Sequence, residues 1–429
     1  SSRMPYGDKY RFYPAVSGAW IISNEAFLRD SRVVDLLKLR ASFGIVGMDA
    51  RLSYDMDKQF NGPGNSYIFA GITSSNSLAQ GALPSAGIEP ERDYKTNVGL
   101  ELSLLGSLSV EVDFFRNMRH NIRTSAAGTV SSVLGVGVPD VFTGKVRNYG
   151  GELAVGWRRR TGDFGYAVRG NIAYARNKIL NKEEEYKPFD YMRITGQPVG
   201  TFYGLVADGM YQDGDFNADG SLKADLPQPM FGAVQPGDIK YRDLDRSGFV
   251  DQNDVTKVGK SPYPEWTYSL GAAFNYRGFD FSFLLQGIAG ASFNLLDNAV
   301  QTRAFVDNGN VYPIARGAWA YYPEQGIDTR ATATYPRLTT QSNENNYQLS
   351  SFWVKSRNFM RVRNIEVGYN FRHHAKFRAA GISNFRIYLN VTNPFTVSKL
   401  MSDYDLDPEL LSYRYPVLKS YNIGVSLTF

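Results

Sequence analysis

Segments in which every second residue is apolar recur along this chain, and they are joined alternately by tight turns and by long connections. A period of two is typical of β-strands that have one apolar face. The segments 266–276 and 279–289 are separated only by Arg277-Gly278, and Leu105-Gly106-Ser107 and Thr161-Gly162-Asp163 make two further short junctions. The pattern predicts about eleven strands, at 11–22, 35–45, 96–104, 108–118, 148–160, 165–176, 266–276, 279–289, 359–371, 384–392 and 419–429.

The long connections between the strand pairs separate two β architectures that alternate equally well. A compact soluble β-sandwich rarely contains several structureless connections of this length. Tight turns at one side and extended loops at the other are the pattern of a bacterial outer-membrane barrel. We therefore predict an all-β fold, a transmembrane antiparallel β-barrel with periplasmic turns. Its extracellular loops would be at about 45–95, 119–147, 177–265, 290–358 and 393–418.

Composition fits this fold and excludes several function classes. No run of about 18 apolar residues predicts a transmembrane helix, and the 28 Tyr and 27 Phe suit strands bounded by aromatic girdles. The chain has no cysteine, which excludes disulfides and thiolate chemistry, and its three histidines supply a zinc or Ser-His-Asp enzyme poorly. The net charge is +5 without a long basic block, so nucleic acid is not an expected partner.

An odd number of strands does not close a single-chain bacterial barrel, because such barrels have an even number. An open barrel would also leave strand edges unpaired in lipid. The chain of 429 residues is therefore expected to be the C-terminal part of a larger barrel. A barrel of roughly 22 strands has the size of the plugged outer-membrane transporters.

Five stretches, in chain order, resemble the SusC/RagA-type branch of the TonB-dependent outer-membrane transporters of Bacteroidota. They are FYPAVSGAWIISNEAFL…VDLLKLRASFGIVGMD, PERDYKTNVGLELSLLGSLSVEVDFFRN, GDIKYRDLDRSGFVDQND, NFMRVRNIEVGYNF and DLDPEL…YPVLKSYNIGVSLTF. The resemblance implies active import of an oligosaccharide or a peptide across the outer membrane of a Gram-negative bacterium. It also implies a SusD-like lipoprotein lid, and energy from TonB-ExbB-ExbD through a plug domain and a TonB box that are not among these residues.

The final strand alternates Tyr421, Ile423, Val425 and Leu427 with small or polar residues and ends at Phe429. Outer-membrane strands that end in an aromatic residue resemble the signal read by the barrel-assembly machinery. These five residues are therefore the expected assembly signal, and a packed edge strand is the alternative.

The stretch DLDRSGFVDQND has the spacing of a calcium loop. Calcium takes six to eight oxygen ligands around a tight turn, and Gly248 stands at the turn position. Ser247 stands where the usual loop has Asp or Asn, and Asp254 stands where it has Glu. Both changes shorten or weaken the ligand set, so the affinity for Ca²⁺ should be modest. An acidic solvated loop is the alternative. The predicted ligands are Asp243, Asp245, Ser247, the carbonyl of Phe249, Asp251 and Asp254.

Aromatic residues gather in the segment GAWAYYPEQG, where Trp319, Tyr321 and Tyr322 are candidates for stacking on sugars or for packing on a lid protein. Packing within the loop is the alternative for all three. Two other functions fit parts of the sequence, a passive porin or adhesin barrel and a secreted calcium-binding enzyme. No set of residues forms a recognisable catalytic constellation, so we predict a transport protein that interacts with outer-membrane lipids, and not an enzyme.

Overall fold

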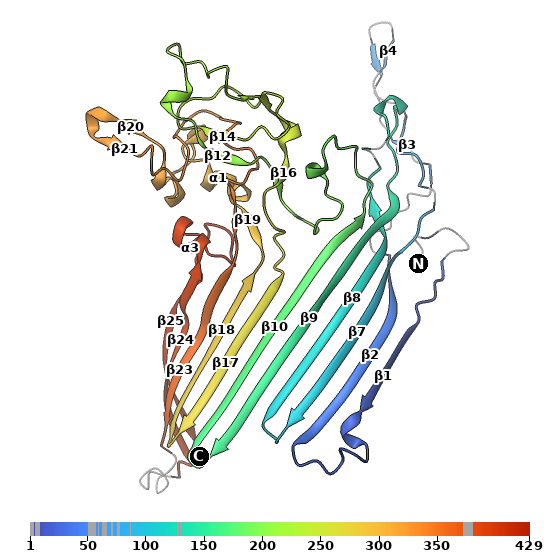
Figure 1. Cartoon of the computed structure of the whole chain (residues 1–429), viewed down its shortest axis with the longest axis vertical. Helices are drawn as coiled ribbons and strands as arrows, with labels where there is room; N and C mark the ends of the chain where they lie inside the picture. Colours follow the sequence, from blue (N-terminus) through green and yellow to red (C-terminus); the bar gives the residue numbers. More distant parts are fainter. Residues whose placement is uncertain are drawn as a thin grey trace.

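Eleven antiparallel strands form one continuous curved sheet (Figure 1). In this computed structural model the described residues are 4, 9–49, 57–58, 60–61, 67–69, 72–74, 78–85, 87–126, 128, 130–371 and 381–429. Each strand of the sheet pairs with the next one in the following order. The strands are β1 (Ala15–Ile21), β2 (Val34–Met48), β7 (Glu91–Leu104), β8 (Leu108–Thr124), β9 (Val141–Thr161), β10 (Phe164–Asn181), β17 (Trp266–Tyr276), β18 (Phe279–Ala289), β23 (Phe359–Asn370), β24 (Asn384–Ser398) and β25 (Ser420–Thr428).

The prediction of eleven antiparallel strands is confirmed, but several strands are longer than predicted at the end where the long loops leave. β8 continues to Thr124 and β9 begins at Val141, so the connection between them is shorter than the sequence suggested. Toward this end the apolar alternation stops while backbone pairing continues. Charged pairs such as Arg123 with Asp140, 2.7 Å apart, hold the strands there instead. Hydrophobic periodicity therefore marks only the part of a strand that has an apolar face.

Tight turns join β7 to β8, β9 to β10 and β17 to β18 at the opposite end of the sheet. Both residues of the turn between β17 and β18 have positive φ, 45° at Arg277 and 94° at Gly278. This is the backbone of a type I′ hairpin, whose twist matches that of the flanking strands. A Cβ at Gly278 would lie 2.7 Å from the carbonyl oxygen of Asn370, so this turn has no room for a side chain.

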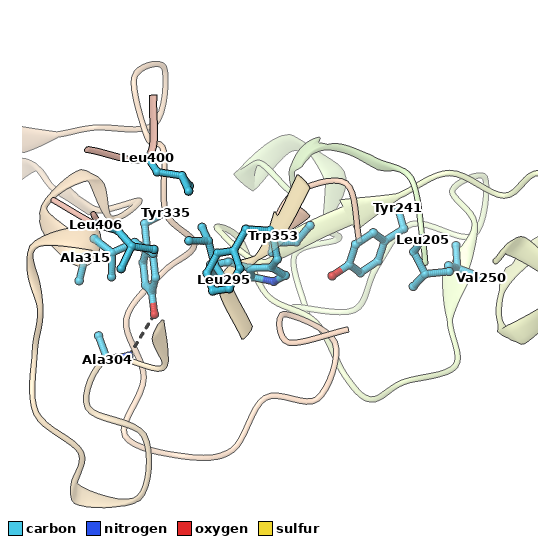
Figure 2. Close-up of a cluster of buried hydrophobic side chains, with 13 residues drawn as sticks. Leu205, Tyr241, Val250, Leu295, Ala304, Ala315, Tyr335, Trp353, Leu400 and Leu406 are labelled. Carbon is cyan, nitrogen blue, oxygen red and sulfur yellow. Dashed lines mark hydrogen bonds between the residues drawn. The ribbon is translucent and has the colours of Figure 1, made fainter. Parts of the chain in front are cut away.

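The loops that follow β10, β18 and β24 pack together into a folded cap over one end of the sheet, and we call this unit the loop cap (Figure 1). Its core includes Leu205, Tyr241, Leu295, Tyr335 and Trp353, which come from two different loops (Figure 2). The short elements of the cap are β11 (Tyr203–Gly204), β12 (Ala207–Met210), β13 (Gln228–Pro229), β14 (Ile239–Tyr241), β15 (Phe249–Val250), β16 (Thr256–Lys257), β19 (Ser292–Asn294), α1 (Ala299–Thr302), β20 (Tyr321–Tyr322), β21 (Ile327–Asp328), β22 (Val354–Ser356) and α3 (Lys399–Tyr404).

Among its described residues, the connection between β2 and β7 has four short strands of its own. They pair as β3 with β6 and β4 with β5. The bounds of these strands are β3 (Phe60–Asn61), β4 (Tyr67–Phe69), β5 (Ile72–Ser74) and β6 (Ala79–Gln80).

Among the described residues, no helix is both long and apolar enough to cross a bilayer.

Candidate functional site

One face of the sheet carries ion pairs between strands that are adjacent or that have one strand between them, and we call it the inner face. Arg40 of β2 lies at the centre of one group, with Nη2 2.5 Å from Asp113 and 3.0 Å from Glu111, both of β8. Its Nε lies 3.1 Å from Glu101 of β7, which also pairs with Lys38. Adjacent strands place these side chains on one face, so the charges are compensated within the wall.

A second group of charges lies on the inner face near the C-terminal end of the sheet. Arg386 of β24 donates to Asp280 of β18 and to Glu366 of β23. Glu366 also accepts from Asn390 at 3.0 Å. Glu111, Asp113 and Glu366 are thus partly neutralised by arginines, and the inner face is polar and mixed in charge.

The loop that follows β24 is anchored to the wall by two arginines of β23. Arg361, whose side chain is 1% exposed, pairs with Asp407 and Glu409, and Arg363 pairs with Glu409. Arg357 donates to the carbonyl of Pro408 at 3.1 Å. The residues of this anchor were not among those predicted from the sequence. The stretches NFMRVRN and DLDPEL, which carry its residues, contain the signal as complementary charge.

The other face of the sheet is apolar and exposed, and we call it the outer face. Phe114 of β8, Trp157 of β9 and Ile423 of β25 are 65%, 50% and 81% exposed on it. Aromatic side chains gather at both ends of this face, as expected for girdles at two membrane interfaces. At the turn end they include the pairs Trp157–Tyr166 and Phe279–Tyr369, and at the loop end Tyr94–His120 and Tyr174–Trp266.

An acidic triad that could hold a metal ion lies in the loop cap. Carboxylate oxygens of Asp243, Asp245 and Asp254 lie within 4.8 Å of one another. Gly248, with φ of 86°, makes the tight turn, and its N–H donates to Asp243 at 2.8 Å. Asp254 is fully buried and accepts the N–H of Leu244 at 2.6 Å. Burial raises the pKa of the Asp254 carboxyl, so its ionised form is short of compensating charge.

The other three predicted calcium ligands lie in the same loop but have other partners. The hydroxyl of Ser247 donates to the carbonyl of Phe249 at 3.3 Å. Asp251 accepts the N–H of Asn253 at 2.6 Å and thereby caps the short 3₁₀-helix Gln252–Asp254. The structure therefore brings the three aspartates together and leaves Asp251 as a helix cap.

The three aromatic candidates lie in different surroundings. Trp319 packs inside the loop cap, because a Cβ at Gly237 would meet its ring at 2.6 Å. Tyr321 is covered on one side by the guanidinium of Arg330, 3.5 Å from the ring centroid. Tyr322 is 57% exposed on the β20–β21 hairpin, which projects from the cap (Figure 1). Trp319 thus has contacts within the loop cap, and Tyr322 is more exposed than Tyr321. A role of these three residues in binding stays a prediction.

The C-terminal strand β25 pairs with β24 through nine residues and is an edge of the described sheet. Its side chains Tyr421, Ile423, Val425 and Leu427 are exposed on the outer face, and Phe429 is 82% exposed. The C-terminus lies at the end of the sheet with the tight turns (Figure 1). The role of these residues in barrel assembly stays a prediction.

Comparisons with known proteins relate the chain to TonB-dependent receptors. No family model matches it. TonB-dependent receptor SusC of Bacteroides thetaiotaomicron is 24% identical, over 100% of this chain and 41% of SusC. TonB-dependent receptor P3 of Formosa agariphila is 22% identical, over 100% of this chain and 43% of that receptor.

Among solved structures, the RagAB peptide importer in its open-open state matches with a TM-score of 0.69 and 19% identity. The match covers 100% of this chain and 44% of the importer chain. Its closed-closed state matches with a TM-score of 0.64. The chain thus spans less than half the length of the relatives it matches, and its eleven strands correspond to part of a receptor barrel.

Proposed function

Because the chain is a SusC/RagA-like part of an outer-membrane TonB-dependent receptor, which is a transporter and not an enzyme, we propose that the complete receptor actively imports an oligosaccharide or a peptide. In this proposal a SusD-like surface lipoprotein closes over the extracellular face, and TonB-ExbB-ExbD supplies the energy through parts of the receptor outside these 429 residues. This chain supplies wall strands and extracellular loops.

The observation that carries the proposal is the combination of a polar inner face with a folded loop cap. The charges of the inner face are compensated in pairs, as in the groups around Arg40 and Arg386. A lining of this kind stays hydrated without a strong field that would select one charge. The cap has a core built from more than one loop, which supports a fixed structure at the outer entrance in this proposal. A passive porin needs no such unit.

The first experiment is a native mass spectrum of the complete receptor extracted from outer membranes in mild detergent. We expect a complex with a lipoprotein, and residual mass identifies any bound cargo. Uptake of that cargo by cells should stop when the proton-motive force is collapsed. A receptor that runs alone, with uptake that survives the uncoupler, would replace active import by the passive-porin function.

We also propose that the acidic triad binds Ca²⁺, with Asp243, Asp245 and Asp254 as carboxylate ligands. Calcium prefers hard oxygen ligands at a flexible, tightly turned loop, and Ser247 and the carbonyl of Phe249 lie in the same turn. A divalent cation would also supply the positive charge that buried Asp254 lacks.

Metal analysis of receptor prepared without chelator tests the calcium proposal. We expect bound calcium, and EGTA should expose the loop to trypsin at Arg246, which is exposed in the turn. Asp243→Asn should abolish both effects. Asp225→Asn changes an exposed aspartate that lies in the connection between β10 and β17 but outside the stretch 243–254, and it should leave both effects intact. Receptor without calcium whose cleavage is insensitive to EGTA would refute the proposal.

A further inference from the structure

Cationic side chains gather on the outer face at the loop end of strands β7 to β10, and we call Arg92, Arg116, Lys145, Arg147 and Arg176 the rim cations. Arg116 of β8 and Arg176 of β10 both stand in register with Tyr149 of β9, one on each side. Residues in register share a face, and so do residues two apart on one strand. Arg147 is therefore on this face too, and its Cζ lies 5.4 Å from the centre of the Tyr149 ring.

These cations have little compensating charge. Within the described part of the chain, no carboxylate forms an ion pair with four of them, which are Arg92, Arg116, Lys145 and Arg147. The fifth, Arg176, has its Nε 3.4 Å from a carboxylate oxygen of Glu265, which also pairs with Lys260. The Nε atoms of Arg92 and Arg147 are buried without a hydrogen-bond partner. Buried polar atoms in native proteins are normally paired, so these two donors add to the uncompensated positive charge that favours an anionic ligand at the patch.

An apolar groove of about 680 Å³ lies directly below the rim cations, toward the middle of the membrane. Gly151 of β9 stands in register between Phe114 of β8 and Tyr174 of β10. Gly151 has no side chain, and the ring of Phe114 lies over it, 3.1 Å from where a Cβ would stand. Gly151, Phe114 and Tyr174 all line the groove. Leu153, Ile172 and Trp266 complete the apolar walls.

We propose that the rim cations and this groove together bind one phosphorylated lipid of the outer leaflet, with its phosphate at Arg116, Arg147 and Arg176 and an acyl chain in the groove. Arginine guanidinium matches phosphate with two parallel hydrogen bonds, and the aromatic girdle places this level at the membrane interface. A free anion would use the cations but not the groove. A transport cargo would meet the inner face, not this one.

The location of the patch within the sheet supports a lipid rather than another part of the receptor. Strands β7 to β10 have strand neighbours on both sides, whereas β1 and β25 are the edges of the described sheet. The outer face of β7 to β10 is therefore away from the edges where further wall strands would join. The inference rests on the outer-membrane location and is independent of which cargo is imported.

The test uses the complete receptor in mild detergent and measures lipid binding by native mass spectrometry, with diphosphorylated lipid A as the probe. Dephosphorylated lipid A and water-soluble glucosamine 6-phosphate are the two comparison ligands. The test variant is Arg116→Gln/Arg147→Gln. Arg159→Gln is the matched control, because Arg159 is an exposed arginine on the same face of β9 at the turn end. Heat-modifiable migration in gels verifies that each variant is folded.

We expect the double variant to bind the phosphorylated probe at least about tenfold more weakly than the wild type, since two charge-assisted contacts are lost. The control should bind as the wild type does. Dephosphorylated lipid A and the soluble headgroup should each bind more weakly than the intact probe. Equal binding by the double variant and the wild type overturns the proposal. So does equal binding of the dephosphorylated lipid, and a headgroup that binds as tightly as the lipid reduces the patch to a simple anion site.

Discussion

Replacing Asp238 by asparagine should loosen the loop cap without affecting the barrel wall. Asp238 has no exposed surface and lies in the loop between β10 and β17. Its carboxylate accepts from three side chains of the loop between β18 and β23: Arg337 at 2.7 Å, Asn346 at 2.8 Å and Asn343 at 3.0 Å. It also accepts the N–H of Gln235 at 2.8 Å. One buried charge therefore joins the two longest loops.

The magnitude follows from these contacts. Asparagine keeps the shape of the side chain but replaces one acceptor oxygen by an NH₂ group. This group would face the N–H donors that now bind the carboxylate. The substitution also leaves Arg337 without its counter-ion. Removing one partner of a buried ion pair costs about 3–5 kcal/mol. The side chain of Arg337 is 24% exposed and can be partly solvated, so we expect about 3 kcal/mol, the lower end of that range.

Hydrogen exchange of the complete receptor measures this loss. The N–H of Ile239 donates to the side chain of Asn346 at 2.8 Å and exchanges only when the cap opens. A loss of about 3 kcal/mol should speed its exchange roughly a hundred-fold, while β7 to β10 stay protected. Asp213→Asn is the matched control, because Asp213 and its partner Arg330 form a solvated surface pair and exchange should barely change. Exchange of Ile239 within about threefold of the wild type would refute the reasoning.

Three further changes test the cap, the inner face and a turn. Trp353→Ala, at a ring that is 1% exposed, should cost the cap about 3–5 kcal/mol and make its loops protease-sensitive; unchanged resistance would contradict the packing seen in Figure 2. Arg40→Gln leaves three carboxylates facing one another and should lower the heat-modifiability midpoint by several degrees, whereas Arg277→Gln, at an exposed pair, should not. Gly278→Ala should destabilise the barrel by about 1–3 kcal/mol. The loss should exceed that of Gly106→Ala, because of these two glycines only Gly278 has backbone within reach of an added Cβ. Equal losses of stability would refute the steric reason.

The sequence determined the wall of this protein, because each strand carries its own information. Alternation at Val98, Leu100 and Leu102, or at Phe279, Phe281 and Phe283, defines a strand and its lipid face without reference to the rest of the fold. Tight turns such as Arg277-Gly278 then fix which strands are neighbours. All eleven strands and the two-sided character of the wall were therefore predictable, as was the convergence of Asp243, Asp245 and Asp254 within one short loop.

The tertiary structure alone decided the contacts between residues that are distant in the chain. Asp238 and Arg337 come from different loops, and Arg361 of strand β23 pairs with Glu409 of the loop after β24. No local period relates the members of either pair. The rim cations lie at irregular spacing in the sequence and meet only through the register of four strands. Strand formation depends on neighbours two residues apart, which the sequence displays directly. The loop cap and the outer-face patch depend on how separate segments meet in space, and folding decides this through packing and charge compensation across the whole chain.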